Sequence, residues 1–313
     1  MIDGLEIVSL GVGSTIPDHR PLSATYVNVD GYEFLIDAPE GVQYRLFKHS
    51  CGLTIDDIYI TNSAKRSLLG LPGLLNTLSY MAERTDPLTI HTPRQTLSKV
   101  REVEDWYSNI KFDINIQEVL PGSRVIERDD WFIDTIDNSI AGSYGLKIED
   151  EPRGEFNREK AKELGVPVGP KFSKLCDGEP VEASDGSTVL PEQVLDTDAK
   201  DPIQIVFSGR TDISSAVETA GQLCDVLIHD AATLSEFQSN GKRASVSQAV
   251  ELASRVNPDH MFLNRLTSGI NHLSDGELIR KANDTSSVPL DINVLSEGTR
   301  ISVRRNEVQI SES

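Results

Sequence analysis

The sequence predicts an α/β fold in which two mixed β-sheets pack face to face and helices cover their outer sides. Strand-like runs precede helix-like runs in both halves of the chain, and the first half is rich in hairpins. A long segment without sustained apolar periodicity separates the two halves. A chain of 313 residues, of which 38% are hydrophobic, can bury one large core of this kind.

In the first half, apolar and β-branched runs alternate with amphipathic stretches. The run LEIVSLG at 5–11 is typical of a buried strand, and SATYVNVDGYEFLID at 23–37 predicts a hairpin that turns at Asp30-Gly31. Further strands are expected at 55–61, 87–93 and 143–149, with two strands inside 113–137 around Pro121-Gly122, and helices are expected at 39–48, 68–83 and 94–105.

The texture changes at residues 151–200, which are rich in Pro, Gly, Lys and Glu and predict one short helix at 157–164. The alternation then resumes, with strands expected at 203–209, 225–231, 260–264, 290–294 and 300–304, and helices at 213–222, 245–256 and 275–283. We therefore interpret residues 1–313 as one domain that carries an insertion at 151–200.

The composition is strongly acidic. The chain has 49 acidic and 30 basic residues and a formal net charge of −19, which is typical of a salt-adapted cytoplasmic protein; an ordinary acidic cytosolic protein is the alternative. Such a chain needs a local basic patch to bind nucleic acid. Three cysteines without a CxxC motif argue against a disulfide framework and a zinc–thiolate site. Neither a signal peptide nor a membrane-spanning run is expected.

The stretch YITNSAKRSLLGLPGLL at 59–75 combines the end of a strand with the start of a helix. Such turns often carry the chemistry of α/β proteins. The residues from Asn62 to Ser67, however, include no obvious metal ligand, general base or nucleophile.

Several segments together resemble the ribonuclease Z family, the tRNA 3′-endonucleases of the metallo-β-lactamase superfamily. LGVGSTIPDHR is similar to the opening of these enzymes, and FLIDAPEGVQYRL resembles their second signature, an Asp followed by Gly-Glu-Gly-x-Gln. ITNSAKRSLLGLPGLL resembles the metal motif Thr-His-x-His-x-Asp-His with its following helix, while VFSGRT and DVLIHDA resemble the Gly-Asp-Thr and His-Glu-Ala segments. The resemblance implies a metallo-β-lactamase fold and runs from about residue 6 to residue 304.

The resemblance also implies that no metal ligand of the family is retained, so that zinc is predicted to be absent. A dinuclear zinc site needs imidazoles and carboxylates at fixed positions. The positions of the family's ligands are occupied by Asn62, Ala64, Arg66, Ser67, Ser139, Arg210, Arg243 and Arg265. Asp230 matches the acid of the family's His-Glu pair, and it is expected to pair with an arginine because an unpaired buried carboxylate is costly. No catalytic residue is therefore assigned.

The replacements are rich in positive charge, which allows two interpretations. One is a metal-free site for an anion or an RNA phosphate, built from Lys65, Arg66, Arg210, Arg243 and Arg265, since guanidinium groups bind phosphate oxygens in a bidentate manner. The other is that these arginines pair with Asp37, Glu40, Asp230 and their neighbours and simply fill the place of the metals.

The segment KAKELGVPVGPKFSKLCDGEPV resembles the exosite arm with which the family contacts the elbow of tRNA. Gly169 and Pro170 are expected at an exposed tip, and the basic residues Arg158, Lys160, Lys162, Lys171 and Lys174 give the insertion a local positive character. In the family's dimers, the arm of one subunit clamps the tRNA that the other subunit cuts. An arm without a present role is the alternative, because several glutamates dilute its charge.

The sequence thus favours a catalytically inactive relative of ribonuclease Z. It would bind tRNA, or support 3′-end processing as the non-catalytic subunit of a homodimer or of a heterodimer with an active ribonuclease Z. One alternative is a scaffold or regulatory dimer subunit without RNA contact, and a second is an active tRNA 3′-endonuclease with an unrecognised site. The second is disfavoured because the sequence offers no paired carboxylates and no histidine base for hydrolysis.

Overall fold

The computed structural model describes residues 2, 4–14, 20–105, 110–128, 130–150, 155–176, 178–196, 202–235, 243–267, 269–270, 273–305 and 307–312. The chain divides into two compact units. The main unit comprises Ile2–Arg128, Phe132–Glu149 and Ile203–Ser313, and the inserted unit consists mainly of Asp150–Pro202. None of the described helices is long and apolar enough to cross a membrane.

The first sheet of the main unit contains the hairpins of the first half of the chain. Among the described residues it has eight strands in the order β19-β18-β1-β2-β3-β4-β5-β6. These are β1 (Leu5–Gly11), β2 (Ala24–Val29), β3 (Tyr32–Ile36), β4 (Asp57–Tyr59), β5 (Leu88–Thr92), β6 (Ile114–Glu118), β18 (Thr299–Arg304) and β19 (Glu307–Glu312). The strands from β3 to β6 are parallel, and their carboxyl ends meet at one edge.

The second sheet contains the strands of the second half. Its order in the part of the chain described is β17-β16-β15-β14-β9-β8-β7. These are β7 (Arg124–Glu127), β8 (Trp131–Ile136), β9 (Gly145–Asp150), β14 (Gln204–Phe207), β15 (Val226–Asp230), β16 (His260–Asn264) and β17 (Ile292–Val294). The strands from β14 to β17 are parallel, and β9 joins β14 in the antiparallel sense.

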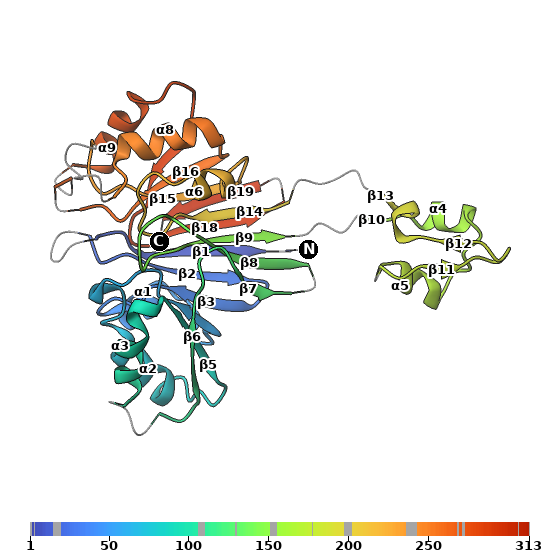
Figure 1. Cartoon of the computed structure of the whole chain (residues 1–313), viewed down its shortest axis with the longest axis horizontal. Coiled ribbons are helices and arrows are strands. Elements are labelled where there is room, and N and C mark those ends of the chain that lie inside the picture. The colour runs from blue at the N-terminus through green and yellow to red at the C-terminus, as the bar shows by residue number, and fades with distance from the viewer. Residues whose placement is uncertain are drawn as a thin grey trace. The chain divides into compact units, whose positions relative to one another are not determined.

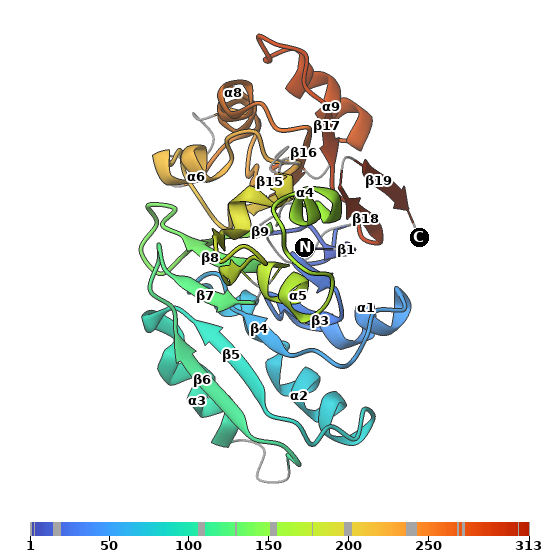
Figure 2. The ribbon, with the colours of Figure 1, turned by 90° about the vertical axis from the view of Figure 1, so that its right-hand side faces the viewer.

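Helices cover the outer face of each sheet, as the two views of Figures 1 and 2 show. The first sheet packs against α1 (Val42–Lys48), α2 (Leu71–Tyr80) and α3 (Leu97–Asp105), and the second against α6 (Ser215–Ala220), α8 (Val246–Val256) and α9 (Asp275–Asn283). Local sequence explains the helix starts: the Ser245 hydroxyl accepts a hydrogen bond from the Gln248 backbone N–H, and Ser274 caps α9 with Glu277 in the same way. The prediction of two sheets with helices outside is confirmed.

Two strand predictions differ from the structure. The segment 113–137 forms three strands and not two, and the turn at Pro121-Gly122 does not close a hairpin, because β6 belongs to the first sheet and β7 to the second. Periodicity alone gives no sign that the chain changes sheets there. The terminal strand β19 was also not expected; its residues are mostly exposed, so they lack the apolar alternation of a buried strand.

The inserted unit is more ordered than its composition indicates. It contains α4 (Arg158–Glu163), α5 (Pro170–Cys176), a short helix at Pro191–Gln193, and two small strand pairs, β10 (Glu155–Phe156) with β13 (Leu195–Asp196) and β11 (Val181–Glu182) with β12 (Thr188–Val189). Only α4 was expected. A small core holds these pieces together and consists of Ala161, Val166, Leu175, Val181, Ala183, Val189 and Val194. These residues are too widely spaced to give a recognisable period.

A buried polar group in the first sheet gives a first testable prediction. Asp57 accepts hydrogen bonds from the Tyr32 hydroxyl and from His91 Nε2, the latter at 3.0 Å, and the ring of Tyr59 stacks on His91 at 4.5 Å between centroids. Burial raises the pKa of Tyr32, so its hydroxyl stays protonated and donates. We expect Asp57→Ala to lower the free energy of unfolding by about 1–3 kcal/mol, because both donors lose their acceptor. Denaturant unfolding measures this loss, with the exposed Asp113→Ala as a control that changes stability little.

Candidate functional site

Close packing against the end of β3 fixes the backbone of the strand-to-helix turn in residues 59–75. The Gly70 backbone N–H donates to the Ala38 carbonyl at 2.8 Å, and a Cβ on Gly70 would lie 2.0 Å from the Pro39 carbonyl oxygen. Only glycine permits so close an approach, and Pro72 follows in the first turn of α2, where its missing N–H is not needed. The frame therefore places residues 62–67 at the carboxyl edge of the first sheet.

Within this turn, the side chains bond to one another. Asn62 Nδ2 donates to Ser67 Oγ at 2.8 Å, and Asn62 Oδ1 accepts from the Ala64 backbone N–H at 3.1 Å. Asn62 Nδ2 also lies 3.4 Å from Asp37 Oδ2, so hydrogen bonds hold this turn together and join it to the end of β3. Ala64 contributes no polar side-chain atom to it.

Asp37, at the end of β3, forms an ion pair with Arg265, which follows β16. Arg265 Nη1 lies 2.8 Å from Asp37 Oδ2, and Thr61 donates to Asp37 from its backbone N–H at 2.8 Å and from its hydroxyl. Asp37 and Arg265 are 1% and 9% exposed, and both adopt positive φ angles, of 60° and 59°. Such conformations persist only where the surroundings fix them. The pair links the carboxyl edges of the two sheets.

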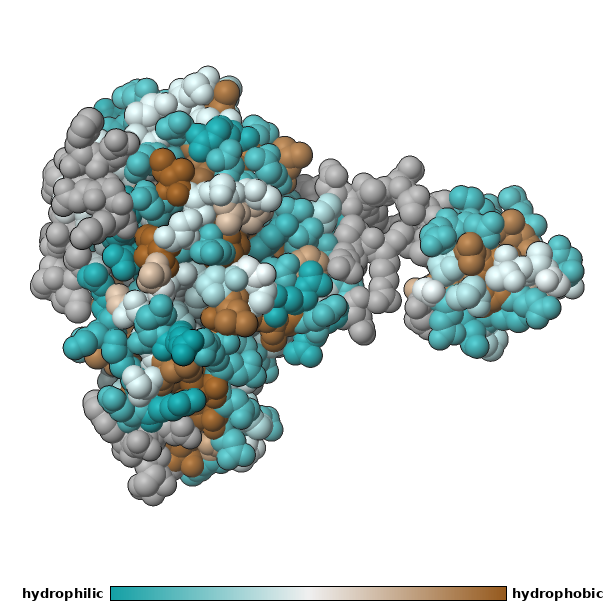
Figure 3. All heavy atoms as spheres, viewed as in Figure 1, coloured by the Kyte–Doolittle hydropathy of each residue, from teal (hydrophilic) through white to brown (hydrophobic). Residues whose placement is uncertain are grey.

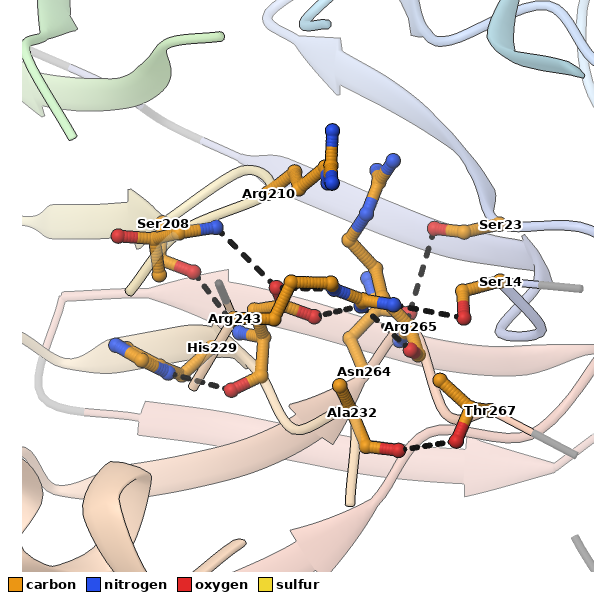
Figure 4. Close-up of polar contacts among 12 residues, drawn as sticks. Ser14, Ser23, Ser208, Arg210, His229, Ala232, Arg243, Asn264, Arg265 and Thr267 are labelled. Carbon is orange, nitrogen blue, oxygen red and sulfur yellow. Dashed lines mark hydrogen bonds and ion pairs between the residues drawn. The ribbon is translucent and has the colours of Figure 1, made fainter. Parts of the chain in front are cut away.

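Asp230, at the end of β15, forms the second ion pair. Arg243 Nε lies 2.9 Å from Asp230 Oδ2, and Arg243 Nη2 contacts Asp230 Oδ1 (Figure 4). The same guanidinium donates to Ser14 Oγ at 2.9 Å and to the Arg265 carbonyl at 2.8 Å. Asp230 is 1% exposed, and it pairs with Arg243, as expected for a buried carboxylate.

Arg66 and Arg210 are the unpaired members of this group. Both are half-buried, and neither guanidinium forms an ion pair or hydrogen bond with another residue in the described ranges. Burial lowers the pKa of Arg66, and Arg243, Arg265 and Arg210 lower it further. Burial and Arg243 likewise lower the pKa of Arg210, against the opposing effect of Asp230.

The structure therefore brings four of the five predicted cationic residues together. We call Arg66, Arg210, Arg243 and Arg265 the arginine cluster. Lys65 is exposed, and it is not among the charges that act on the pKa of Arg66. No described ion pair joins Glu40 to an arginine. The interpretation in which carboxylates neutralise the arginines therefore holds for Arg243 and Arg265 but not for Arg66 and Arg210.

The position of Ser139 differs from that of the other predicted residues. Ser139 is exposed and has a φ of 65°, whereas its neighbour Asn138 is fully buried. Asn138 Nδ2 donates to the Ser208 carbonyl at 3.0 Å and to Ser143 Oγ at 3.1 Å. Asn138 is thus the buried residue of this loop, and Thr61 and Ser14 are further site residues that the sequence did not single out. Both lie in segments that the resemblance covers, Ser14 in LGVGST and Thr61 in ITNSAKR.

His229 lies beside Asp230 and points toward a small cavity. Its Nδ1 lies 2.8 Å from the Asp230 carbonyl oxygen, so Nδ1 carries the proton, and Nε2 has no described partner. Burial lowers the pKa of His229, which keeps the imidazole neutral. The cavity has a volume of about 20 Å³, is also lined by Thr61, Asn264 and Arg265, and has room for about one water.

The residues present do not fit a zinc centre. Zinc requires thiolate, imidazole or carboxylate donors, whereas the positions implied by the resemblance offer an amide, a methyl group, hydroxyls and guanidinium groups. Asp37 and Asp230 remain, but each is bonded to a guanidinium. The described ranges contain no group of three or more His, Cys, Asp or Glu side chains that could hold a metal. His19 and His272 lie outside the described residues.

In the inserted unit, the predicted basic residues lie mainly at the surface. Arg158, Lys160, Lys162, Pro170 and Lys174 are exposed, and Gly169 and Lys171 are half-buried. Lys171 donates to the Glu182 carbonyl, and Lys174 lies 3.8 Å from Glu179. Arg158 and Lys162, together with Phe156 and Phe172, line a pocket of about 540 Å³, and neither cation has an ion pair with a described residue.

In a comparison with known proteins, the chain is similar in sequence to ribonuclease Z of several archaea. The chain is 35% identical over 272 residues to ribonuclease Z of Halobacterium salinarum, which covers 84% of this chain and 87% of the relative. It is 36% identical over 250 residues to ribonuclease Z of Haloferax volcanii, which covers 78% of each. No protein-family model matches the chain.

Solved structures share the fold at much lower sequence identity. The metallo-β-lactamase fold protein YhfI from Bacillus subtilis superposes with a TM-score of 0.64 at 12% identity, covering 96% of this chain and all of the other. The short form of human tRNase Z gives a TM-score of 0.61 at 16% identity, covering 96% and 99%. The expectation of a metallo-β-lactamase fold is thereby confirmed.

Proposed function

Because the chain belongs to the ribonuclease Z family, we propose that it is a non-catalytic member, which binds tRNA and supports 3′-end processing by an active member. One observation carries the proposal. The residues at the family's metal positions cannot ligate zinc, and the two remaining carboxylates are already bonded to Arg243 and Arg265. Hydrolysis of a phosphodiester would need another source of an activated water.

The inserted unit supports the RNA-binding part of the proposal. Arg158 and Lys162 supply positive charge beside the ring pair Phe156–Phe172, whose centroids lie 4.9 Å apart. Cations that contact phosphates and aromatic rings that stack on bases are the usual elements of a surface for single-stranded or distorted RNA. This local patch contrasts with the net charge of −19 and with the hydrophilic surface that dominates Figure 3.

Exposed apolar residues support association with a second chain. Tyr44 and Phe47 lie one turn apart on α1 and are 73% and 44% exposed, and Tyr80 and Met81, at the end of the neighbouring α2, are 53% and 68% exposed. Exposed apolar side chains are typical of surfaces that bind another protein when they form a contiguous patch. The partner in this proposal is a second copy or an active ribonuclease Z.

Binding of precursor tRNA tests the proposal directly. We expect the purified protein to bind precursor tRNA in an electrophoretic mobility assay, and Arg158→Ala/Lys162→Ala to weaken binding about tenfold or more, because two phosphate contacts are lost. The control Arg280→Ala/Lys281→Ala removes the same charge from exposed positions of α9. Equal binding by both double variants would place the RNA contact away from Arg158 and Lys162, and absence of tRNA binding by the parent protein would favour the scaffold subunit without RNA contact.

A cleavage assay tests the non-catalytic part. We expect the protein alone to release no 3′ trailer from precursor tRNA, with or without added zinc, and we expect zinc analysis to find less than stoichiometric metal. Cleavage by the pure protein would establish the third possibility, an endonuclease with an unrecognised site. Affinity purification from the source cell, probed for an intact ribonuclease Z, tests the heterodimer.

A further inference from the structure

We propose that Arg66 and Arg210 form a binding site for a single, doubly charged phosphate group of the monoester type. This inference rests on the proposed function only in taking the arginine cluster to be free of zinc. It differs from the substrate of a phosphodiesterase, in which the phosphate at the reacting centre carries one charge. The ligand would be inorganic phosphate or the terminal phosphate of an RNA or nucleotide.

The geometry separates the cluster into two pairs with different roles. Arg243 and Arg265 are bonded to Asp230 and Asp37 and link the ends of strands in both sheets. Arg66 comes from the turn after β4 in the first sheet, and Arg210 follows β14 in the second sheet. The turn that carries Arg66 is bridged through Asn62 to Ser143, and Ser143 Oγ donates to the Arg210 carbonyl at 2.8 Å, so the two arginines come from neighbouring loops. The charge of Arg210 helps to lower the pKa of Arg66, and the charge of Asp230 only partly opposes the lowered pKa of Arg210. Two such forks from opposite sides can donate to several oxygens of one phosphate.

The charge of the cluster selects the kind of anion. The four guanidinium groups of the cluster carry four positive charges, and the carboxylates of Asp37 and Asp230 balance two of them. These six side chains together therefore have a net charge of +2. A diester phosphate carries one negative charge and would leave one cation uncompensated, whereas a monoester near neutral pH carries close to two. Uncompensated charge in a half-buried site is unfavourable. The dianion is therefore the better match.

A second observation concerns Arg265, another member of the arginine cluster. The Nε atom of Arg265 is buried and has no hydrogen-bond partner in the described ranges, although Nη1 of the same group is held by Asp37. A buried donor without an acceptor is rare in a native structure. An anion or its bound water next to the cluster would supply that acceptor. The exposed Lys65 is adjacent in sequence and would add only long-range attraction.

Thermal unfolding in the presence of small phosphates tests the proposal at constant ionic strength and constant chloride. Inorganic phosphate and methyl phosphate are expected to raise Tm in a saturable manner, and dimethyl phosphate, a diester, is expected to bind at least tenfold more weakly. Affinity should fall below about pH 6, where the monoester loses its second charge. The lowered pKa of His229 keeps its imidazole neutral at that pH, so the change in affinity reports the charge of the ligand.

Substitutions test whether Arg66 and Arg210 bind the phosphate, and their melting temperatures show whether each variant is folded. Arg66→Gln and Arg210→Gln should each weaken phosphate binding at least tenfold, while Lys65→Gln should leave it within twofold. Without phosphate, each of the first two variants should melt at or above the temperature of the parent protein, because each removes repulsion from a cluster of like charges. This gain cannot come from a misfolded variant.

Three outcomes would overturn the inference: dimethyl phosphate binding as tightly as methyl phosphate, equal binding to the parent and to Arg66→Gln, or no saturable binding at all. Its failure is distinguishable from failure of the proposed function. Loss of phosphate binding with retained tRNA binding would place RNA recognition in the inserted unit alone. Phosphate binding without tRNA binding would instead make the cluster a small-molecule site.

Discussion

Asp230→Asn is expected to lower the free energy of unfolding by about 3–5 kcal/mol, the range found when one partner of a buried ion pair is removed. The side chain of Arg243, which is only 12% exposed, would then lack the carboxylate that balances its charge. In a chain of this size the loss corresponds to a fall in Tm of roughly 10 °C. Chemical denaturation at fixed salt, with far-ultraviolet circular dichroism, measures the difference.

A surface ion pair provides the control for this prediction. Glu218 pairs with Arg255 at 3.1 Å, and their side chains are 32% and 39% exposed. Glu218→Gln should therefore change stability by less than about 1 kcal/mol. Equal effects of Asp230→Asn and Glu218→Gln would contradict a structural role for the Arg243–Asp230 pair. Because Asp230→Asn also raises the positive charge of the cluster, added phosphate should recover part of the lost stability.

The sequence predicts the layers of the fold better than its connections. Buried strands such as β1 and β15 are predominantly apolar, and α8 carries both an apolar stripe and its own cap, so each is recognisable locally. The change of sheet between β6 and β7 is not recognisable, because both strands show weak apolar patterns and neither contains a fully buried residue. Likewise α5 was missed, because Leu175 is its only fully buried side chain.

At the candidate site, the sequence indicates which residue types converge but not how they pair. Arg210 and Arg243 are both expected near Asp230, and nothing in the order of residues says that Arg243 takes the carboxylate while Arg210 remains free. That choice depends on the positions of Ser14 and the Arg265 carbonyl, which complete the hydrogen bonds of Arg243. Ser139 and Asn138 show the same limit, since local geometry decides which neighbour is buried.

Leu175→Ala is expected to unfold the inserted unit while the main unit stays folded. Leu175 is fully buried in a core of seven described residues, and its truncation should cost about 2–5 kcal/mol. A unit of some 50 residues has little stability of its own, so a loss of this size exceeds what it can sustain. Hydrogen exchange measured by mass spectrometry should show rapid exchange across 155–196 and unchanged protection in β1 and β15.

The matched control is Leu190→Ala, because Leu190 belongs to the same unit but is 44% exposed, and it should leave hydrogen exchange almost unchanged. Unfolding of both units together by Leu175→Ala would contradict the independence of the inserted unit. The variant also separates the two proposed binding surfaces. If tRNA binds through Arg158 and Lys162, Leu175→Ala should abolish that binding, whereas stabilisation by inorganic phosphate, which depends on Arg66 and Arg210 in the main unit, should persist.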